Sequence, residues 1–170
     1  VIQGMADLDP DVDAIHRLIS NKEITFKKAG TFSLLNGQYC PFNSQNTLVI
    51  KDLFPLLYLP AFVSFRFTDI LRGLVAQPIM HVAGYQLSFS NATVYQERNP
   101  HNLMRDFESE IPCYLQSERV VEAALSVASA NESIVDNLFN TYVKLEKEKI
   151  VSNSEVDLVQ NWLEDLSQSN

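Results

Sequence analysis

The sequence is poor in cysteine, glycine and proline, and each shortage excludes a class of protein. Two cysteines, Cys40 and Cys113, are too few for a disulfide framework or a cysteine-rich zinc site. They can pair once, or both can be buried thiols, and the buried-thiol interpretation is favoured. Five Gly and seven Pro in 170 residues exclude collagen-like and low-complexity chains.

Basic residues are scarce as well. Lys and Arg total 13 against 21 Asp and Glu, which gives a formal net charge of -8. Binding to a phosphate backbone or to an anionic membrane surface draws its free energy from clustered Lys and Arg. We therefore expect no nucleic-acid partner and no polybasic membrane contact.

Long apolar runs are also missing. The longest, residues 53–63, contains Pro55 and Pro60 and is too short to span a bilayer, so no membrane segment is expected in this chain. Residues 1–5 have neither the cationic nor the apolar part of a signal peptide. We interpret the chain as a fragment, or the tail, of a longer protein whose targeting information lies upstream.

The hydrophobic content of 46% is that of a globular protein, and its pattern in residues 1–116 mixes strands with helices. Asp9, as N-cap before Pro10, predicts a first helix that stops near residues 20–21. A loosely alternating segment over 24–32 predicts an edge strand. Residues 41–47 are polar, aromatic and aperiodic, which is typical of a functional loop.

The next segments alternate between the two periods. Residues 62–67 predict a strand, and Thr68 as N-cap predicts a helix that Pro78 kinks or breaks and Gly84 closes. A further strand is predicted over 86–94. In residues 117–170 the apolar side chains recur about every 3.6 positions and predict roughly three helices. The fold class is therefore α/β, followed by a helical tail.

Asp69 is the acidic residue with two interpretations. It follows a predicted strand and opens a helix, so it can be a carboxylate delivered to a cleft for acid–base chemistry. It can equally be an acid in the first turn that complements the helix dipole. Spacing alone favours the second interpretation.

The remaining motifs are weak. His16, His81 and His101 lack metal-ligand spacing, and only His101 is placed on a loop where it could ligate a metal or touch a phosphate. The acidic run over residues 7–13 lacks the Gly and Glu of a calcium loop. No glycine-rich phosphate loop or nucleophile motif is present.

Three longer strings go further: QGMADLDPDVDAIHRL (3–18), PFNSQNTL (41–48) and TDILRG (68–73). Together they resemble the STELLO family, glycosyltransferases best known as Golgi proteins in plants. The resemblance covers nearly the whole chain. It implies a GT-A-like fold, with residues 1–116 as the C-terminal, acceptor-side part and residues 117–170 as a helical tail used for packing or assembly.

The resemblance also implies chemistry. A nucleotide-sugar donor and a divalent metal, Mn or Mg, would be held in the complete protein by an upstream half, and the sugar would pass to a glycan or protein acceptor. By motif, Asp69 becomes the general base, which reverses the preference from spacing. The other implied roles are acceptor or sugar binding by Asn43, Ser44 and Asn46, orientation of Asp69 or a phosphate by Arg72, and metal binding by His101.

Three hypotheses follow for the chain. The first is a partial glycosyltransferase domain, active if an upstream donor-binding half completes it. The alternative is a non-catalytic Golgi assembly or scaffold protein that keeps a degenerate glycosyltransferase fold and binds a protein partner through residues 117–170. The third is a truncated gene product without activity.

Overall fold

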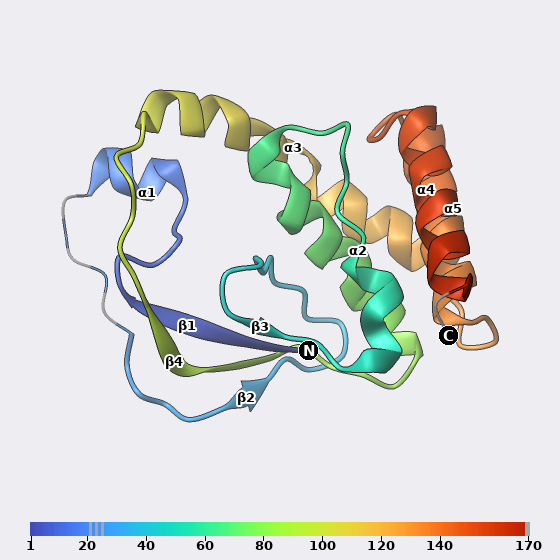
Figure 1. The fold of residues 1–170 in the computed structure, drawn as a ribbon, viewed down its shortest axis with the longest axis horizontal. Coiled ribbons are helices and arrows are strands. Elements are labelled where there is room, and N and C mark those ends of the chain that lie inside the picture. Colours follow the sequence, from blue (N-terminus) through green and yellow to red (C-terminus); the bar gives the residue numbers. More distant parts are fainter. Residues whose placement is uncertain (21, 23, 25, 169–170) are drawn as a thin grey trace.

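The helices and strands are known from a computed structural model, which describes residues 1–20, 22, 24 and 26–168. Figure 1 shows a small sheet at one end of the molecule and a pair of helices, α4 and α5, at the other, with α2 and α3 between them. The elements in chain order are β1 (Ile2–Leu8), α1 (Ala14–Ile19), β2 (Phe32–Ser33), β3 (Thr47–Leu48), the 3-10 helices η1 (Lys51–Leu57) and η2 (Phe65–Phe67), α2 (Thr68–Val82), β4 (Ser88–Gln96), α3 (Leu103–Val127), α4 (Ile134–Lys147) and α5 (Asn153–Gln168).

The sheet has the strand order β2-β4-β1-β3. Its centre is the parallel pair β1 and β4, whose register shifts between Gly4 and Ala6. The edge strands β2 and β3 are antiparallel and only two residues long. The predicted mixture of strands and helices is therefore confirmed as a mixed α/β fold with a small mixed sheet.

The helical region is built around α2. This helix packs against η1, α3 and α4, and its Leu71 and Ile79 are fully buried. Gly84 has a φ of 83°, the left-handed conformation that ends many helices, so its predicted role is confirmed. Pro78 lies inside α2 without breaking it, and the helix continues to Val82.

Several local predictions are wrong. Residues 62–67 form no strand, because the chain runs through a loop into η2. The cap of α1 is Asp13, whose side chain accepts from the His16 N–H, and Asp9 instead pairs with Arg17 at 2.7 Å. Thr68 does not cap α2, because its hydroxyl donates to the Phe65 carbonyl.

Two further predictions are met in part. Of the described residues in the segment predicted as an edge strand, only Phe32 is in a strand, and residue 25 lies outside the described residues. The predicted stop of the first helix is confirmed at its C-cap, Ser20, while Asn21 lies outside the described residues. Cys40 and Cys113 form no disulfide, and both are half-buried.

The helical tail is continuous with the rest of the molecule. Helix α3 runs through Pro112 and across position 117, and α4 and α5 follow it as predicted. Glu155 of α5 is fully buried and accepts hydrogen bonds from the Tyr58 hydroxyl and from the backbone N–H groups of Ala61 and Phe62. This carboxylate fixes the loop after η1 against α5. No helix among the described residues is long and apolar enough to cross a membrane.

Candidate active site at the start of helix α2

A cavity of about 780 Å³ lies where the start of α2 meets α3, the loop at residues 41–44 and the acidic segment 11–13. This volume falls in the usual range for small-molecule sites. Its walls carry four carboxylates and two exposed aromatic rings; these side chains are Asp11, Asp13, Asp69, Glu110, Phe65 and Tyr114. The cavity therefore combines acid–base groups with surfaces on which a sugar ring could stack.

Asp69 is in the first turn of α2 and also lines this cavity, so both interpretations of the residue describe its position. Its Oδ2 accepts a hydrogen bond of 3.1 Å from the backbone N–H of Ser44. An acidic residue in the first turn of a helix complements the positive end of the helix dipole. Asp69 is thus positioned as a carboxylate that one loop residue orients.

Arg72 lies behind the loop rather than on the cavity wall. It is 7% exposed, and its guanidinium donates to the Ser44 hydroxyl at 2.9 Å and to the Asn43 carbonyl at 3.3 Å. The same group stacks over the Phe42 ring. Burial lowers the pKa of Arg72, while the negative charge of Asp69 opposes that shift. Arg72 therefore holds the loop that orients Asp69.

Two other residues of α2 bring the loop close. Gln77 is fully buried and pairs with both backbone groups of Cys40, at 3.0 Å to the N–H and 2.9 Å to the carbonyl. A Cβ on Gly73 would lie 2.9 Å from the Phe42 carbonyl oxygen, so only glycine allows this approach. The polar loop predicted as functional is thus a rigid, hydrogen-bonded wall.

Of the three residues predicted to bind the acceptor or sugar, two line the cavity and one does not. Asn43 and Ser44 line the cavity, although the Asn43 amide oxygen already accepts from the Gln45 N–H at 3.1 Å. Asn46 does not line it. Its amide donates to the Met5 carbonyl at 2.9 Å and to the Thr93 hydroxyl at 3.0 Å, beside the register shift between β1 and β4. Asn46 therefore joins the loop to the sheet.

The acidic wall opposite Asp69 was missed in the sequence. Glu110 is 8% exposed and accepts from the Ala14 N–H at 2.7 Å. Burial raises the pKa of this carboxyl, although the Ala14 N–H and the charge of Arg66 oppose the shift. Burial also raises the pKa of Tyr114 to about 12, with a contribution from the charge of Asp13. Glu110 lies inside α3, and its contact with Ala14 spans 96 positions of the sequence, so periodicity gave no sign of its role.

Cys113 completes this wall as a thiol. Burial raises its pKa to about 11, and the nearby charges of Glu110 and Asp69 add to the shift. A thiol with such a pKa stays protonated at neutral pH and is a poor nucleophile. The acid–base capacity of the cavity therefore lies in its carboxylates.

His101 lies outside the cavity and belongs to an ion-pair network beside it. Its Nδ1 is 3.1 Å from Asp106 Oδ2 and 3.2 Å from Arg66 Nη2, and Arg66 also pairs with Asp106 at 2.8 Å. Burial alone would raise the pKa of Asp106, but the Arg66 and His101 contacts outweigh it and lower that pKa. An adjacent guanidinium opposes binding of a cation at this ring nitrogen.

The described residues contain no group of three or more His, Cys, Asp and Glu side chains arranged to hold a metal ion. The side chains around His101 therefore do not fit a metal site by themselves.

The fold and the cavity together define a class: a mixed α/β protein in which a helix presents a carboxylate to a pocket of substrate size. A family model described as STELLO glycosyltransferases matches residues 66–170, which include Asp69, Arg72 and His101. The chain belongs to the STELLO glycosyltransferase family.

A curated relative extends the similarity over the N-terminal part of the chain. The probable glycosyltransferase STELLO2 of Arabidopsis thaliana is 24% identical over 172 residues, which cover 96% of this chain. The chain spans only 22% of the length of that relative. The similarity therefore includes the loop at 41–47, although it concerns a small part of the longer protein.

Proposed function

We propose that this chain is the acceptor-side part of a glycosyltransferase that moves a sugar from a nucleotide-sugar donor to a glycan or protein acceptor. The observation that carries the proposal is the carboxylate of Asp69, set at the start of α2 on the wall of a cavity of about 780 Å³. Family membership supplies the reaction class. The GT-A-like character of the fold, a donor-binding half upstream and action in the Golgi are parts of the same proposal that rest on the resemblance.

In this proposal Asp69 is the general base. Its Oδ2 is held by the Ser44 N–H, so Oδ1 is the oxygen placed to take the proton from an acceptor hydroxyl. The acceptor oxygen then bonds to the anomeric carbon of the donor sugar, and the nucleoside diphosphate leaves with the electron pair of the broken bond. Such a transfer inverts the configuration of the anomeric carbon.

The neighbouring groups would bind and orient. Ser44 and Asn43 border the same cavity, and Arg72 keeps them in register with Asp69 through its two hydrogen bonds. The Phe65 ring is 84% exposed at the cavity and offers a face to a sugar. Asn46 and His101 have no direct part in this arrangement, because the first binds the sheet and the second an ion-pair network.

The test uses the full-length protein and the variant Asp69→Asn. Asparagine keeps the shape of the side chain and an oxygen that accepts from the Ser44 N–H, but it takes up no proton. We expect sugar turnover, measured as nucleoside diphosphate released from a panel of nucleotide sugars, to fall by about a hundredfold or more. The thermal unfolding midpoint should stay close to that of the wild type.

Asp157→Asn is the matched control, since Asp157 is exposed on α5, a helix that contributes no residue to the cavity wall. It should leave turnover unchanged. Equal turnover in Asp69→Asn and the wild type would remove Asp69 from the chemistry.

The alternative of a non-catalytic assembly protein depends on a free apolar face in residues 117–170. Much of that face is used within the chain, since Leu138, Tyr142, Leu145 and Val159 belong to the common hydrophobic core. Removing residues 117–170 should therefore unfold the protein rather than only release a partner. A deletion variant that stays folded and loses only partner capture would favour the alternative.

A further inference from the structure

A second pocket, of about 630 Å³, lies between α1, the end of β1 and the segment from Arg98 to His101 that follows β4. The chain enters it from Leu8, a non-glycine residue with a φ of 74°. Such a left-handed residue is uncommon and costs conformational energy. The surrounding structure therefore enforces the turn from β1 into this pocket.

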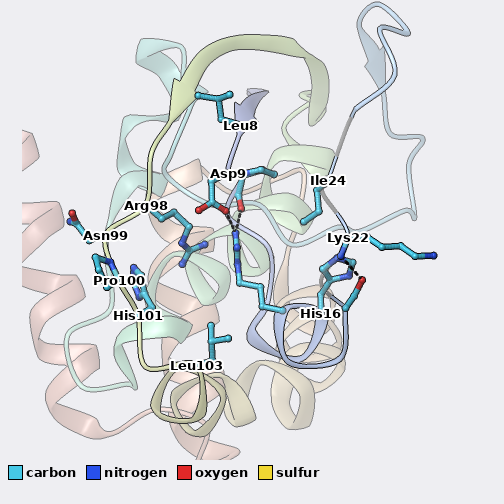
Figure 2. A pocket seen from close by; sticks show the side chains of 13 residues that line it. Leu8, Asp9, His16, Lys22, Ile24, Arg98, Asn99, Pro100, His101 and Leu103 are labelled. Carbon is cyan, nitrogen blue, oxygen red and sulfur yellow. Dashed lines mark hydrogen bonds and ion pairs between the residues drawn. The ribbon is translucent and has the colours of Figure 1, made fainter.

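The charge of this pocket is opposite to that of the protein. The chain has a formal net charge of -8, yet Arg17, Lys22 and Arg98 line the pocket against Asp9, the single acid among the described lining residues. Figure 2 shows the guanidinium of Arg98 turned toward the middle of the pocket, whereas Lys22 extends away from it. Two histidines, His16 and His101, complete the lining.

Two buried polar atoms of the pocket have no hydrogen-bond partner among the described residues. Arg17 Nη2 contacts Asp9 at 2.7 Å and the Pro10 carbonyl at 2.6 Å, but Arg17 Nε is one of these two atoms. The other is His16 Nε2. Native proteins seldom leave buried polar atoms unpaired, because such a group loses its hydrogen bonds to water and gains none in return.

Arg98 has N–H donors to spare. Its side chain is 8% exposed, and the one polar contact it makes within the described part of the chain joins Nη1 to Asp11 Oδ1 at 2.7 Å. A guanidinium has five N–H donors in a rigid fork that matches pairs of oxygens on a tetrahedral anion. The buried position of Arg98 strengthens any such contact, because water competes less there.

We propose that this second pocket binds a phosphate monoester or free phosphate through Arg98 and Arg17, with His16 and His101 as flanking groups. The site is separate from the Asp69 cavity and does not depend on the proposed sugar transfer. Its volume exceeds that of phosphate, so a phosphorylated sugar fits as well as the free ion. The two sources share the same oxygens and the same arginine contacts.

An ion pair connects the two pockets. Asp11, which pairs with Arg98, lines the first cavity together with Arg66, 3.8 Å away from it. A phosphate on Arg98 would compete with Asp11 for the same guanidinium. The backbone amide of Asp11 is therefore a natural reporter of occupancy from outside the pocket.

The test is a titration of the protein with potassium phosphate, followed by 1H–15N NMR, against sodium chloride at equal ionic strength. We expect saturable shifts at residues 8–11, 16–20 and 97–101 with phosphate and none with chloride. Glucose 6-phosphate and glucose form the second pair of ligands. Tighter binding of glucose 6-phosphate than of phosphate indicates a sugar-borne ligand, whereas equal or weaker binding indicates the free ion.

Three variants decide whether the pocket is the site. Arg98→Gln should weaken phosphate binding about tenfold or more, as expected for the loss of a charged hydrogen bond. His16→Gln should weaken it to a smaller extent and serves if Arg98→Gln does not fold. Arg105→Gln removes the same charge from an exposed position outside the pocket and should bind as the wild type does.

Two results would overturn the proposal. One is a wild-type titration with no saturable phosphate shifts at these residues. The other is an equal loss of affinity in Arg98→Gln and Arg105→Gln, which would show only a general effect of net charge. Both results are independent of turnover, so they leave the proposed role of Asp69 untouched.

Discussion

The sheet and the helical region are held together by different forces. Helices α2, α4 and α5 share an apolar core in which Leu71, Leu145 and Val159 are fully buried. The sheet has two long strands, two edge strands of two residues each, and a connection to α2 through the hydrogen-bonded loop at 40–47. Apolar burial therefore supplies most of the stability, and polar contacts set the geometry of the candidate site, which lies where the two regions meet.

The largest expected effect lies in the helical region, where the buried carboxylate of Glu155 joins α5 to the loop after η1 by hydrogen bonds. Glu155→Ala leaves the Tyr58 hydroxyl and the N–H groups of Ala61 and Phe62 without an acceptor in a buried place. We expect the free energy of unfolding, measured by urea denaturation, to fall by roughly 3–5 kcal/mol.

Glu164→Ala is the control for this change. Glu164 is exposed on the same helix, so its loss should alter the free energy of unfolding by about 0.5 kcal/mol or less. If the two variants were equally stable, α5 would not be fixed to the loop after η1. The contrast between the two regions would then sharpen, because apolar packing alone would hold α5 in place.

The second prediction concerns the connection between the regions. Gln77→Leu puts an apolar side chain of similar size into α2 and leaves the N–H and carbonyl of Cys40 unpaired. We expect a loss of about 3 kcal/mol in the free energy of unfolding. Gln160→Leu, at an exposed position of α5, should cost about 0.5 kcal/mol or less.

The NMR spectrum of Gln77→Leu separates stability from site geometry. Amide shifts should change over residues 40–47, because the loop loses its hydrogen bonds to Gln77, one of its supports on α2. Unchanged shifts there would mean that the contacts of Arg72 and Asp69 position the loop without Gln77.

The helices could be predicted from the sequence because their signals are local. Apolar residues three and four positions apart define α2, α4 and α5, and a glycine in the left-handed conformation ends α2. The prediction of a strand over 62–67 was wrong, because a short alternating run can form a strand only where a neighbouring strand is available to pair with it. The chain there packs as η2 against α3 instead.

The candidate site could be predicted only in its central residue and in the loop beside it. Asp69 and Ser44 are far apart in the sequence, but the family strings contain both. The roles of Asn46 and Glu110 depend on contacts over 41 and 96 positions, to Met5 and Ala14. No local pattern carries such information, so these partners appear only in the folded chain.

A third prediction tests the polar connection from the side of the sheet. A Cβ on Gly4 would overlap the amide nitrogen of Asn46, which is fixed by its hydrogen bonds to Met5 and Thr93. Gly4→Ala should therefore lower the free energy of unfolding by about 2 kcal/mol. Asn46→Ala should cost about 1 kcal/mol through its lost hydrogen bonds.

The double variant gives the sharper result. Asn46→Ala removes the atoms that the new methyl group meets. The double variant should therefore lose about 1 kcal/mol less free energy of unfolding than the two single variants lose together. Simple additivity would show that Asn46 is not the group that packs against Gly4, and that the sheet is attached in another way.

The smallest expected effect is a pH dependence at the acidic wall of the cavity. The pKa of Glu110 is raised, first by burial, so the folded state holds its proton more tightly than the unfolded state does. The resulting stability is fully present below the pKa of the unfolded chain, near 4.3, and is lost as the pH rises through the folded pKa.

Glu110→Gln stays neutral and keeps an acceptor for the Ala14 N–H. Its free energy of unfolding should therefore rise relative to that of the wild type as the pH increases from about 4 to 7, by about 1 kcal/mol or less. Glu108→Gln, two positions away and exposed, should follow the wild type over the same range. A gain that appears instead on going to lower pH would mean that the Arg66 charge outweighs burial at this wall, and the site would then be held by ion pairs rather than by desolvated acids.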